Sequence, residues 1–321
     1  MKNLPCLLSV TKNILEYRKF HVPDEFLFLY FTNINLKFNI HSPDYYLMPS
    51  FDILISKINT AGFKRNLGIE YTEQTLETNE EKWDEALSAV KSNANVIIKG
   101  LNINSRLHSE GLWKNTPTYM AIHKYDKNLK HFIISNHRFT EKIGLDVLKD
   151  YVAKGEKHGA EKNWWGKVNI TNLPHFTTKH LLDLLLEKID EEEYVSPSTN
   201  IFNLKDGIDK LCNGSNTTLK NILFKNLSGQ LIHPHGPVSS RNRLASILKT
   251  LSDTKYIDSN ISIKYQIIYK EWEILSLMFI KYSLKNNEDL LLRILNKLNS
   301  ISEKEEEAFG LLLQLNKEVK L

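Results

Sequence analysis

Apolar side chains recur at helical spacing along several segments in the first half of the chain. In residues 5–19, Leu7, Val10 and Ile14 share one helical face. Pro5 suits the first helical position, because an N–H has no partner there. The same spacing recurs further along, so the pattern predicts helices over residues 5–19, 48–62, 79–93 and 143–153.

Other segments between these helices have the composition of β-strands. Residues 95–103 predict a buried strand, and residues 118–139 contain two β-rich runs around the polar turn Asp126–Asn128. Residues 154–167 are rich in Gly and Lys and predict a loop. Trp164 and Trp165 would then be large aromatic side chains on a loop, a position from which such side chains often cover a pocket.

The pattern changes at about residue 176. From there to the end of the sequence the helical period continues, and no strong strand pattern interrupts it. We therefore predict an α+β domain over residues 1–172 and an all-helical domain over residues 173–321.

The composition is that of an ordinary globular protein, with 41% apolar and 25% charged residues. The net charge of +4 is too small to favour nucleic acid as a partner. No stretch reaches the roughly 20 apolar residues that a membrane helix requires, and the first residues lack a signal-peptide pattern. With only two cysteines among 321 residues, we expect no disulfide framework and a cytoplasmic location.

Cys6 follows Pro5 at the start of the first predicted helix. Its sulfur would lie there near unpaired N–H groups and the positive end of the helix dipole, an environment that lowers the pKa of a thiol. Cysteine is also among the residue types most often buried as a small apolar side chain. The pattern therefore leaves two interpretations open, a nucleophile at a helix start or a core residue.

A cysteine nucleophile needs a base, and the base needs a group that orients it. If the turn lies at residues 126–129, Thr118 falls opposite or diagonal to Asn136 and His137 in the strand pair. Asn136 could orient an imidazole, and His137 is the nearest imidazole in the sequence. Because neighbouring residues of a strand point to opposite faces, Asn136 and His137 can both face Cys6 only if the strand ends there. His123 is another candidate for the base.

The sequence gives little reason to expect a metal or a cofactor. His233 and His235 alternate in a short segment, but no cysteine or carboxylate stands near them at metal-ligand spacing. The chain also has no Walker loop, no dinucleotide-binding glycine pattern and no zinc-binding set of cysteines. We expect neither a metal site nor a bound cofactor.

Several stretches occur in the order and spacing of a known family. Cys6 is followed by ILEYRKFHVPDEFLFLY, WDEALSAVKSNANVIIKGLNI, TYMAIHKYD and FIISNHRFTEKIGLDVLKDYVA, and the second half contains GPVSSRNRLASILKTLSD and ISEKEEEAFGLLLQL. In this order the chain resembles the butirosin biosynthesis protein H family over nearly its whole length. The resemblance implies a papain-like (C39 peptidase-like) domain with the cysteine-protease fold, followed by a helical domain.

The resemblance also implies a role for each matching position. Cys6 takes the place of the nucleophile, Thr118 that of the family's histidine, and Asn136 that of its aspartate. Asparagine can orient a catalytic group, as it does in papain-like triads, whereas threonine has no lone pair basic enough to replace histidine. Backbone N–H groups near Cys6 and Leu7 would form the oxyanion site.

The activity that this family implies is acyl transfer in the biosynthesis of specialised metabolites. The acyl group would leave the thioester of an acyl carrier protein for the cysteine, and would then pass to a small-molecule amine to form an amide. Such carriers are usually acidic, so the lysines of the predicted loop would offer a docking surface: Lys154, Lys157, Lys162 and Lys167.

Two other functions follow from the same residues. The first is a catalytically inactive papain-like scaffold that binds a carrier or a partner enzyme, which the threonine at position 118 favours. The second, a peptidase or amidase, is weaker, because the leaving amine needs a general acid and Thr118 cannot supply one. The sequence carries no signal for an oligomeric state.

Overall fold

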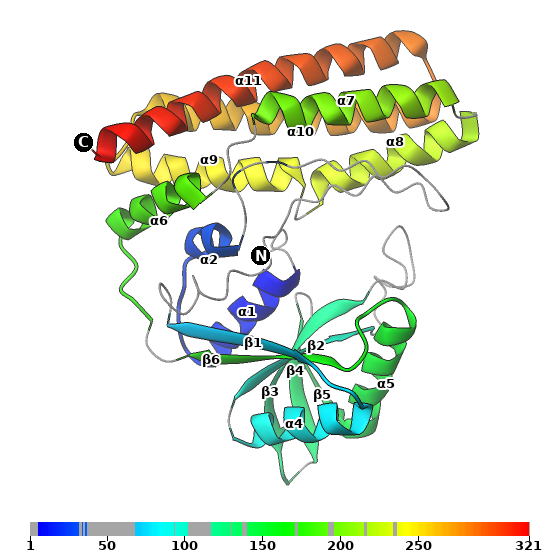
Figure 1. The fold of residues 1–321 in the computed structure, drawn as a ribbon, viewed down its shortest axis with the longest axis vertical. Helices are drawn as coiled ribbons and strands as arrows, with labels where there is room; N and C mark the ends of the chain where they lie inside the picture. The colour runs from blue at the N-terminus through cyan, green and yellow to red at the C-terminus, as the bar shows by residue number, and fades with distance from the viewer. Residues whose placement is uncertain are drawn as a thin grey trace. The chain divides into compact units, whose positions relative to one another are not determined.

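The structure is a computed structural model of the chain. It describes residues 6–31, 34, 36, 68–92, 94–101, 117–128, 130–136, 140–170, 173–191, 196–214, 217–233 and 236–320. These residues confirm the predicted α+β organisation, with a six-stranded antiparallel sheet in the N-terminal half and helices in the C-terminal region (Figure 1).

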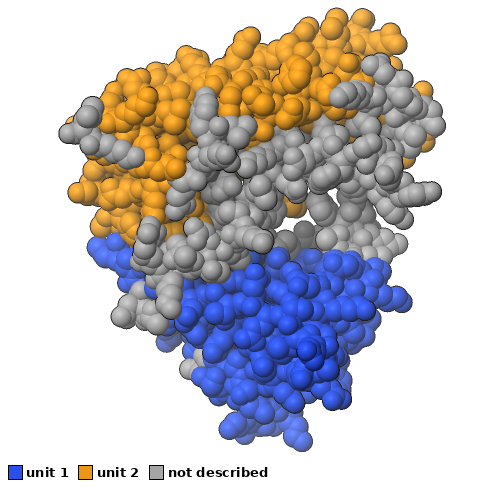
Figure 2. Space-filling view, in the orientation of Figure 1, with its two compact units in different colours: residues 1–23, 59–175 blue, residues 24–58, 176–321 orange. Residues whose placement is uncertain are grey.

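The chain divides into two compact units (Figure 2). Unit 1 contains residues 1–23 and 59–175, and unit 2 contains residues 24–58 and 176–321. The end of unit 1 lies close to the predicted boundary after residue 172. Unit 2 differs from the predicted helical domain because it also takes in residues 24–58.

Unit 1 is built on the sheet, whose strands lie in the order β1-β6-β2-β3-β4-β5 and are all antiparallel to their neighbours. Its elements, in chain order, are α1 (Cys6–Tyr17), β1 (Ile69–Thr75), α4 (Asn79–Lys91), β2 (Asn95–Gly100), β3 (Thr118–Asp126), β4 (His131–Ser135), β5 (Thr140–Gly144), α5 (Leu145–Lys157) and β6 (Trp164–Ile170).

The helices α4 and α5 cover one face of this sheet (Figure 1). Their apolar side chains pack with alternate strand residues, among them Val96, Ile98, Met120 and Ile122. The helix α5 comes so close to β2 that a Cβ atom on Gly155 would lie 2.8 Å from the Cα of Gly100. The helix α1 lies on the opposite face, where it contacts β3 and β4.

The sequence pattern located several of these elements. The helices predicted over residues 5–19, 79–93 and 143–153 correspond to α1, α4 and α5, and the predicted strand pair corresponds to β3 and β4 with its turn after Asp126. The helix predicted over residues 48–62 lies outside the described residues.

The loop predicted over residues 154–167 is wrong. The helix α5 continues to Lys157, and β6 begins at Trp164, so only a short turn separates them. Glu156 stabilises that turn, because its carboxylate accepts from the Asn163 backbone N–H at 3.0 Å and from buried Lys82 at 2.7 Å. Both tryptophans of β6 are buried on opposite faces of the sheet, and the lysines predicted as one docking loop are divided between α5, the turn and β6.

Unit 2 consists of helices in the part of it that the structure describes. They are α2 (Asp24–Phe31), α6 (Thr178–Glu191), α7 (Pro197–Gly214), α8 (Thr217–Ile232), α9 (Pro237–Asp253), α10 (Ser259–Lys285) and α11 (Glu288–Lys320). The early helix α2 belongs here because its aromatic side chains pack on α6 and the residues before it. The Tyr30 hydroxyl lies 3.3 Å from Nε2 of His180, and the ring centroids of Phe26 and Phe176 are 4.8 Å apart.

A buried ion pair joins α9 to α11 in unit 2. The Nε of Arg241 donates to Oε1 of Glu305 at 2.7 Å, and both side chains are inaccessible to water. The same carboxylate oxygen accepts from the Trp272 indole of α10 at 2.8 Å, and Nη1 of Arg241 donates to the Ile34 carbonyl. Three long helices and the segment after α2 therefore meet at one pair of charges.

We predict that Glu305→Ala lowers the free energy of unfolding by about 3–5 kcal/mol, because it leaves the Arg241 guanidinium buried without its counter-charge. Glu307→Ala is the matched control on the same helix. Glu307 pairs with Lys264 in an exposed position, so its loss should cost less than about 1 kcal/mol. Urea unfolding of both variants measures the difference, and equal midpoints would contradict the prediction.

Candidate functional site

The proposed nucleophile stands at the first residue of α1, since that helix begins at Cys6. The structure describes the backbone of Cys6 but not its side chain. The next five residues, 7–11, are all buried. The first N–H groups of a helix have no partner within the helix, so α1 presents backbone donors from a start enclosed by protein.

Two contacts fix the direction of α1 on the sheet. The ring of Tyr17 stacks on that of His123 in β3, with centroids 4.5 Å apart. One turn earlier in the helix, Nδ2 of Asn13 donates to Oγ of Ser135 at 3.3 Å and to the carbonyl of Asn136 at 2.7 Å. Ser135 pairs with Ala121, so Asn13 lies at the level of Ala121 and Tyr17 at that of His123. From Tyr17 toward its first residue, α1 therefore runs toward the start of β3.

This direction brings the beginning of α1 to the end of the sheet that the sequence singled out. Cys6 precedes Asn13 by two turns, or about 10 Å at the usual rise of an α-helix. The same distance covers about three residues of a strand. Counted from Ala121, that is the level of Thr118, where β3 begins, three residues beyond the point where β4 ends at Ser135.

The side chain of Thr118 lies on the sheet face away from α1. Thr118 pairs with Gly100. Because every second residue of a strand points to the same face, Thr118 shares the face of Met120 and Ile122, which α4 and α5 cover. Ala121 and Ser135 belong to the other face, which α1 covers. Thr118 is therefore at the predicted level of the sheet, but its hydroxyl does not face the helix that begins with Cys6.

Asn136 and His137 follow β4 directly. Asn136 is buried, and its carbonyl holds the Asn13 side chain of α1. The continued register of β3 and β4 would place Asn136 opposite Met120, diagonal to Thr118, as the sequence predicted. His137 lies outside the described residues, so its role as base stays a prediction.

His123 is buried on the α1 face, at a bulge where the register of β3 shifts. Its Nε2 lies 2.6 Å from Oγ of Ser135, and its Nδ1 is buried without a hydrogen-bond partner. Burial, and secondarily the charge of Arg18, lowers the pKa of His123 to about 4. It stacks on Tyr17, eleven residues or about 16 Å along α1 from Cys6, which is too far for direct proton transfer.

A cluster of a lysine with aromatic side chains lies on the same face and at the same end of the sheet. Nζ of Lys99 lies 4.2 Å from the ring centroid of Trp164 and 5.3 Å from that of Tyr119. The Trp164 indole donates to Glu73 at 3.2 Å. The cluster was not predicted, because the glycine- and lysine-rich composition of residues 154–167 indicates a loop; the available signal was the alternation of side chains that begins at Trp164.

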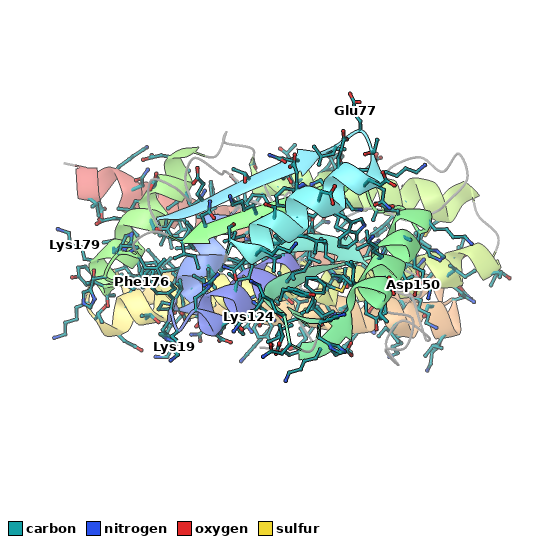
Figure 3. The ribbon with its side chains drawn as sticks, turned by 90° about the horizontal axis from the view of Figure 1, so that it is seen from below. Lys19, Glu77, Lys124, Asp150, Phe176 and Lys179 are labelled. Carbon is teal, nitrogen blue, oxygen red and sulfur yellow. The ribbon has the colours of Figure 1, made fainter. Side chains whose placement is uncertain are left out.

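Several charged residues elsewhere on unit 1 are exposed to solvent. Lys124, the next residue after the bulge, is exposed, as is Glu77 in the turn between β1 and α4 (Figure 3). Asp150 forms an exposed ion pair with Lys154 on α5. The polar groups that contact α1 are therefore separate from the solvated charges on the rest of unit 1.

The remaining residues singled out in the sequence lie in unit 2. Cys212 of α7 is buried, and burial raises the pKa of its thiol. Burial lowers the pKa of His233 to about 4, and His235 lies outside the described residues. Among the residues that the structure describes, no three His, Cys, Asp or Glu side chains come together as they would to hold a metal ion.

We predict that unit 1 loses stability as the pH falls from 6.5 toward 4. An unfolded chain protonates His123 near its ordinary pKa of 6.5, whereas the folded protein resists protonation down to about 4. The loss attributable to this group is about 3 kcal/mol. Unfolding at pH 7.5 and 4.5 should therefore differ less in His123→Gln than in the wild type.

His233→Gln is the control for the second buried histidine, since its pKa is lowered equally and it lies in the other unit. NMR titration of the imidazole resonances separates the two. A His123 resonance that titrates near 6.5 would contradict the buried, neutral state on which the expected pH dependence rests.

The described helices include none long and apolar enough to cross a membrane. No protein-family model and no curated protein sequence matches this chain. The residues of unit 1 therefore carry the evidence for a function.

Proposed function

We propose that this protein is a cysteine-dependent acyltransferase of papain-like fold, which moves an acyl group from a carrier-protein thioester to an amine. The observation that carries the proposal is the course of α1. A helix that begins with a cysteine crosses an antiparallel sheet, and counted along β3 its start would lie near the level of Thr118. Cys6 would then be two helical turns, or about 10 Å, from Asn13, the residue that binds the Asn136 carbonyl.

The reaction would proceed in two acyl substitutions. The Cys6 thiolate attacks the thioester carbonyl, and the carrier thiol leaves with its electron pair as the new thioester forms. The amine then attacks the acyl-cysteine, loses its proton to water, and releases the Cys6 thiolate. In both steps negative charge develops on the carbonyl oxygen, which the backbone N–H groups at the start of α1 would stabilise.

Under this proposal the thiolate forms by a lowered thiol pKa and not by a paired histidine. Thr118 takes no part as a base, because it lacks a basic lone pair and its side chain is on the other face of the sheet. A thioester donor tolerates this arrangement, since its leaving group is a stable thiolate that needs no general acid. The resemblance gives Asn136 an orienting role, but its continued register opposite Met120 would put its side chain on the face that α4 and α5 cover, so that its backbone carbonyl is the group that meets α1.

The second candidate function is a non-catalytic scaffold that binds a carrier protein or a partner enzyme. The orientation of Thr118 favours it, as does the distance between His123 and the start of α1. In that case Cys6 would be a small apolar residue, consistent with the buried residues that follow it, and the fold would retain the papain-like architecture without its chemistry.

The reactivity of Cys6 distinguishes the two functions. We expect iodoacetamide at neutral pH to label Cys6 at least about tenfold faster than Cys212, whose thiol is buried and has a raised pKa. Mass spectrometry of the digested protein measures both rates in one sample. Equally slow labelling of the two cysteines would contradict a tuned nucleophile and favour the scaffold.

The covalent step has its own test. Incubation with an acylated carrier protein or a simple acyl thioester should add the mass of the acyl group to the wild type and to Cys212→Ala, but not to Cys6→Ala. An amine acceptor should then remove the adduct as an amide. Turnover that persists in a folded Cys6→Ala variant would exclude the covalent mechanism.

A further inference from the structure

The outward face of α10 carries an apolar stripe that is exposed in the part of the chain that the structure describes. Positions 263, 267, 270, 274, 277, 281 and 284 follow one another at alternating steps of four and three residues, the spacing of a coiled-coil seam. All seven side chains are exposed. Five of them are apolar and between 45% and 77% exposed, namely Ile263, Ile267, Ile274, Leu277 and Leu284.

This stripe is separate from the face by which α10 joins the helical unit. The inward face buries large side chains, among them Tyr265, Trp272 and Phe279, against α8, α9 and α11. A surface helix needs only one apolar face to fold onto its unit. The stripe is a second apolar face, three heptads or about 32 Å long, which the described residues of unit 2 do not bury.

We propose that this stripe pairs with the same stripe of a second copy of the chain, in an antiparallel arrangement about a two-fold axis at the level of residue 272. The two lysines of the stripe, Lys270 and Lys281, decide both the partner and the direction. A parallel two-fold pair would set each lysine against its own copy, which brings like charges together.

The antiparallel pair removes that conflict, because each of its layers joins two different positions of the stripe. Lys270 then meets Ile274 of the other copy, and Lys281 meets Ile263 of the other copy. A lysine stem can cover apolar surface while its ammonium stays in water. Glu273, an exposed acid beside the stripe, comes within reach of Lys270 of the other copy, so the charges at the centre are complementary.

The size of the interface predicts a weak dimer. A single pair of three-heptad helices lies at the lower end of the areas that stable protein interfaces bury. Its dissociation constant should therefore fall in the micromolar range. The pairing is independent of the proposed chemistry, since α10 belongs to unit 2 and Cys6 to unit 1.

Sedimentation of the full chain over roughly 1 to 200 µM tests the proposal. We expect the wild type to move from monomer to dimer over this range. Leu277→Glu should raise the dissociation constant by at least about tenfold, because it places a charge in the centre of the seam. Leu292→Glu is the matched control: Leu292 is 60% exposed, against 62% for Leu277, but it lies on α11 outside the stripe.

The direction of pairing is tested by exchanging charges. Lys270→Glu alone should weaken the dimer, and the double variant with Glu273→Lys should restore it. A monomer at every concentration overturns the proposal and leaves the stripe to a different partner. A dimer that Leu277→Glu does not weaken, or that Leu292→Glu weakens equally, overturns it as well.

Discussion

The hydrogen bonds of the Asn13 side chain set the geometry on which the functional argument depends. An amphipathic helix can slide along a sheet at little cost, because apolar contacts have no direction. The Asn13 amide removes that freedom, since it donates both to Ser135 and to the carbonyl of Asn136. With these bonds made, the middle of α1 is fixed beside the end of β4, and the helix starts two turns before that point.

The two units hold their buried polar groups in different ways. In unit 1 the groups between α1 and the sheet are neutral: an amide, a hydroxyl and an imidazole whose pKa is lowered by burial. In unit 2 a full ion pair, Arg241 with Glu305, joins α9 and α11. A neutral network costs less to desolvate than an ion pair, but it gives unit 1 a sensitivity to acid through His123.

The elements that the sequence predicted correctly are those whose pattern is strong within one segment. The period of residues 5–19 and the β-rich run of 118–139 depend on local neighbours, and both elements form as expected. The strand β6 was missed because glycine and lysine surround Trp164 and Trp165. Their burial on opposite sheet faces depends on β1 and β2, which are distant in the sequence.

The site shows the same limit. The spacing of the strand pair placed Thr118 and Asn136 at one end of the sheet, because strand register is countable from a turn. The face to which each side chain points was not predictable in the same way. Whether a side chain faces α1 depends on the face of the sheet on which α1 packs. Residues such as Asn13 and Tyr17 decide that face, and their partners lie more than a hundred residues away in the sequence.

The orientation of Thr118 also bears on which acyl donors the proposed chemistry could use. Cleavage of an amide requires a proton for the leaving nitrogen, and a side chain facing α4 and α5 cannot deliver one at the start of α1. A thiolate leaves without that proton. If Cys6 is a nucleophile, the lack of a general acid at position 118 therefore restricts it to donors with a good leaving group, such as thioesters.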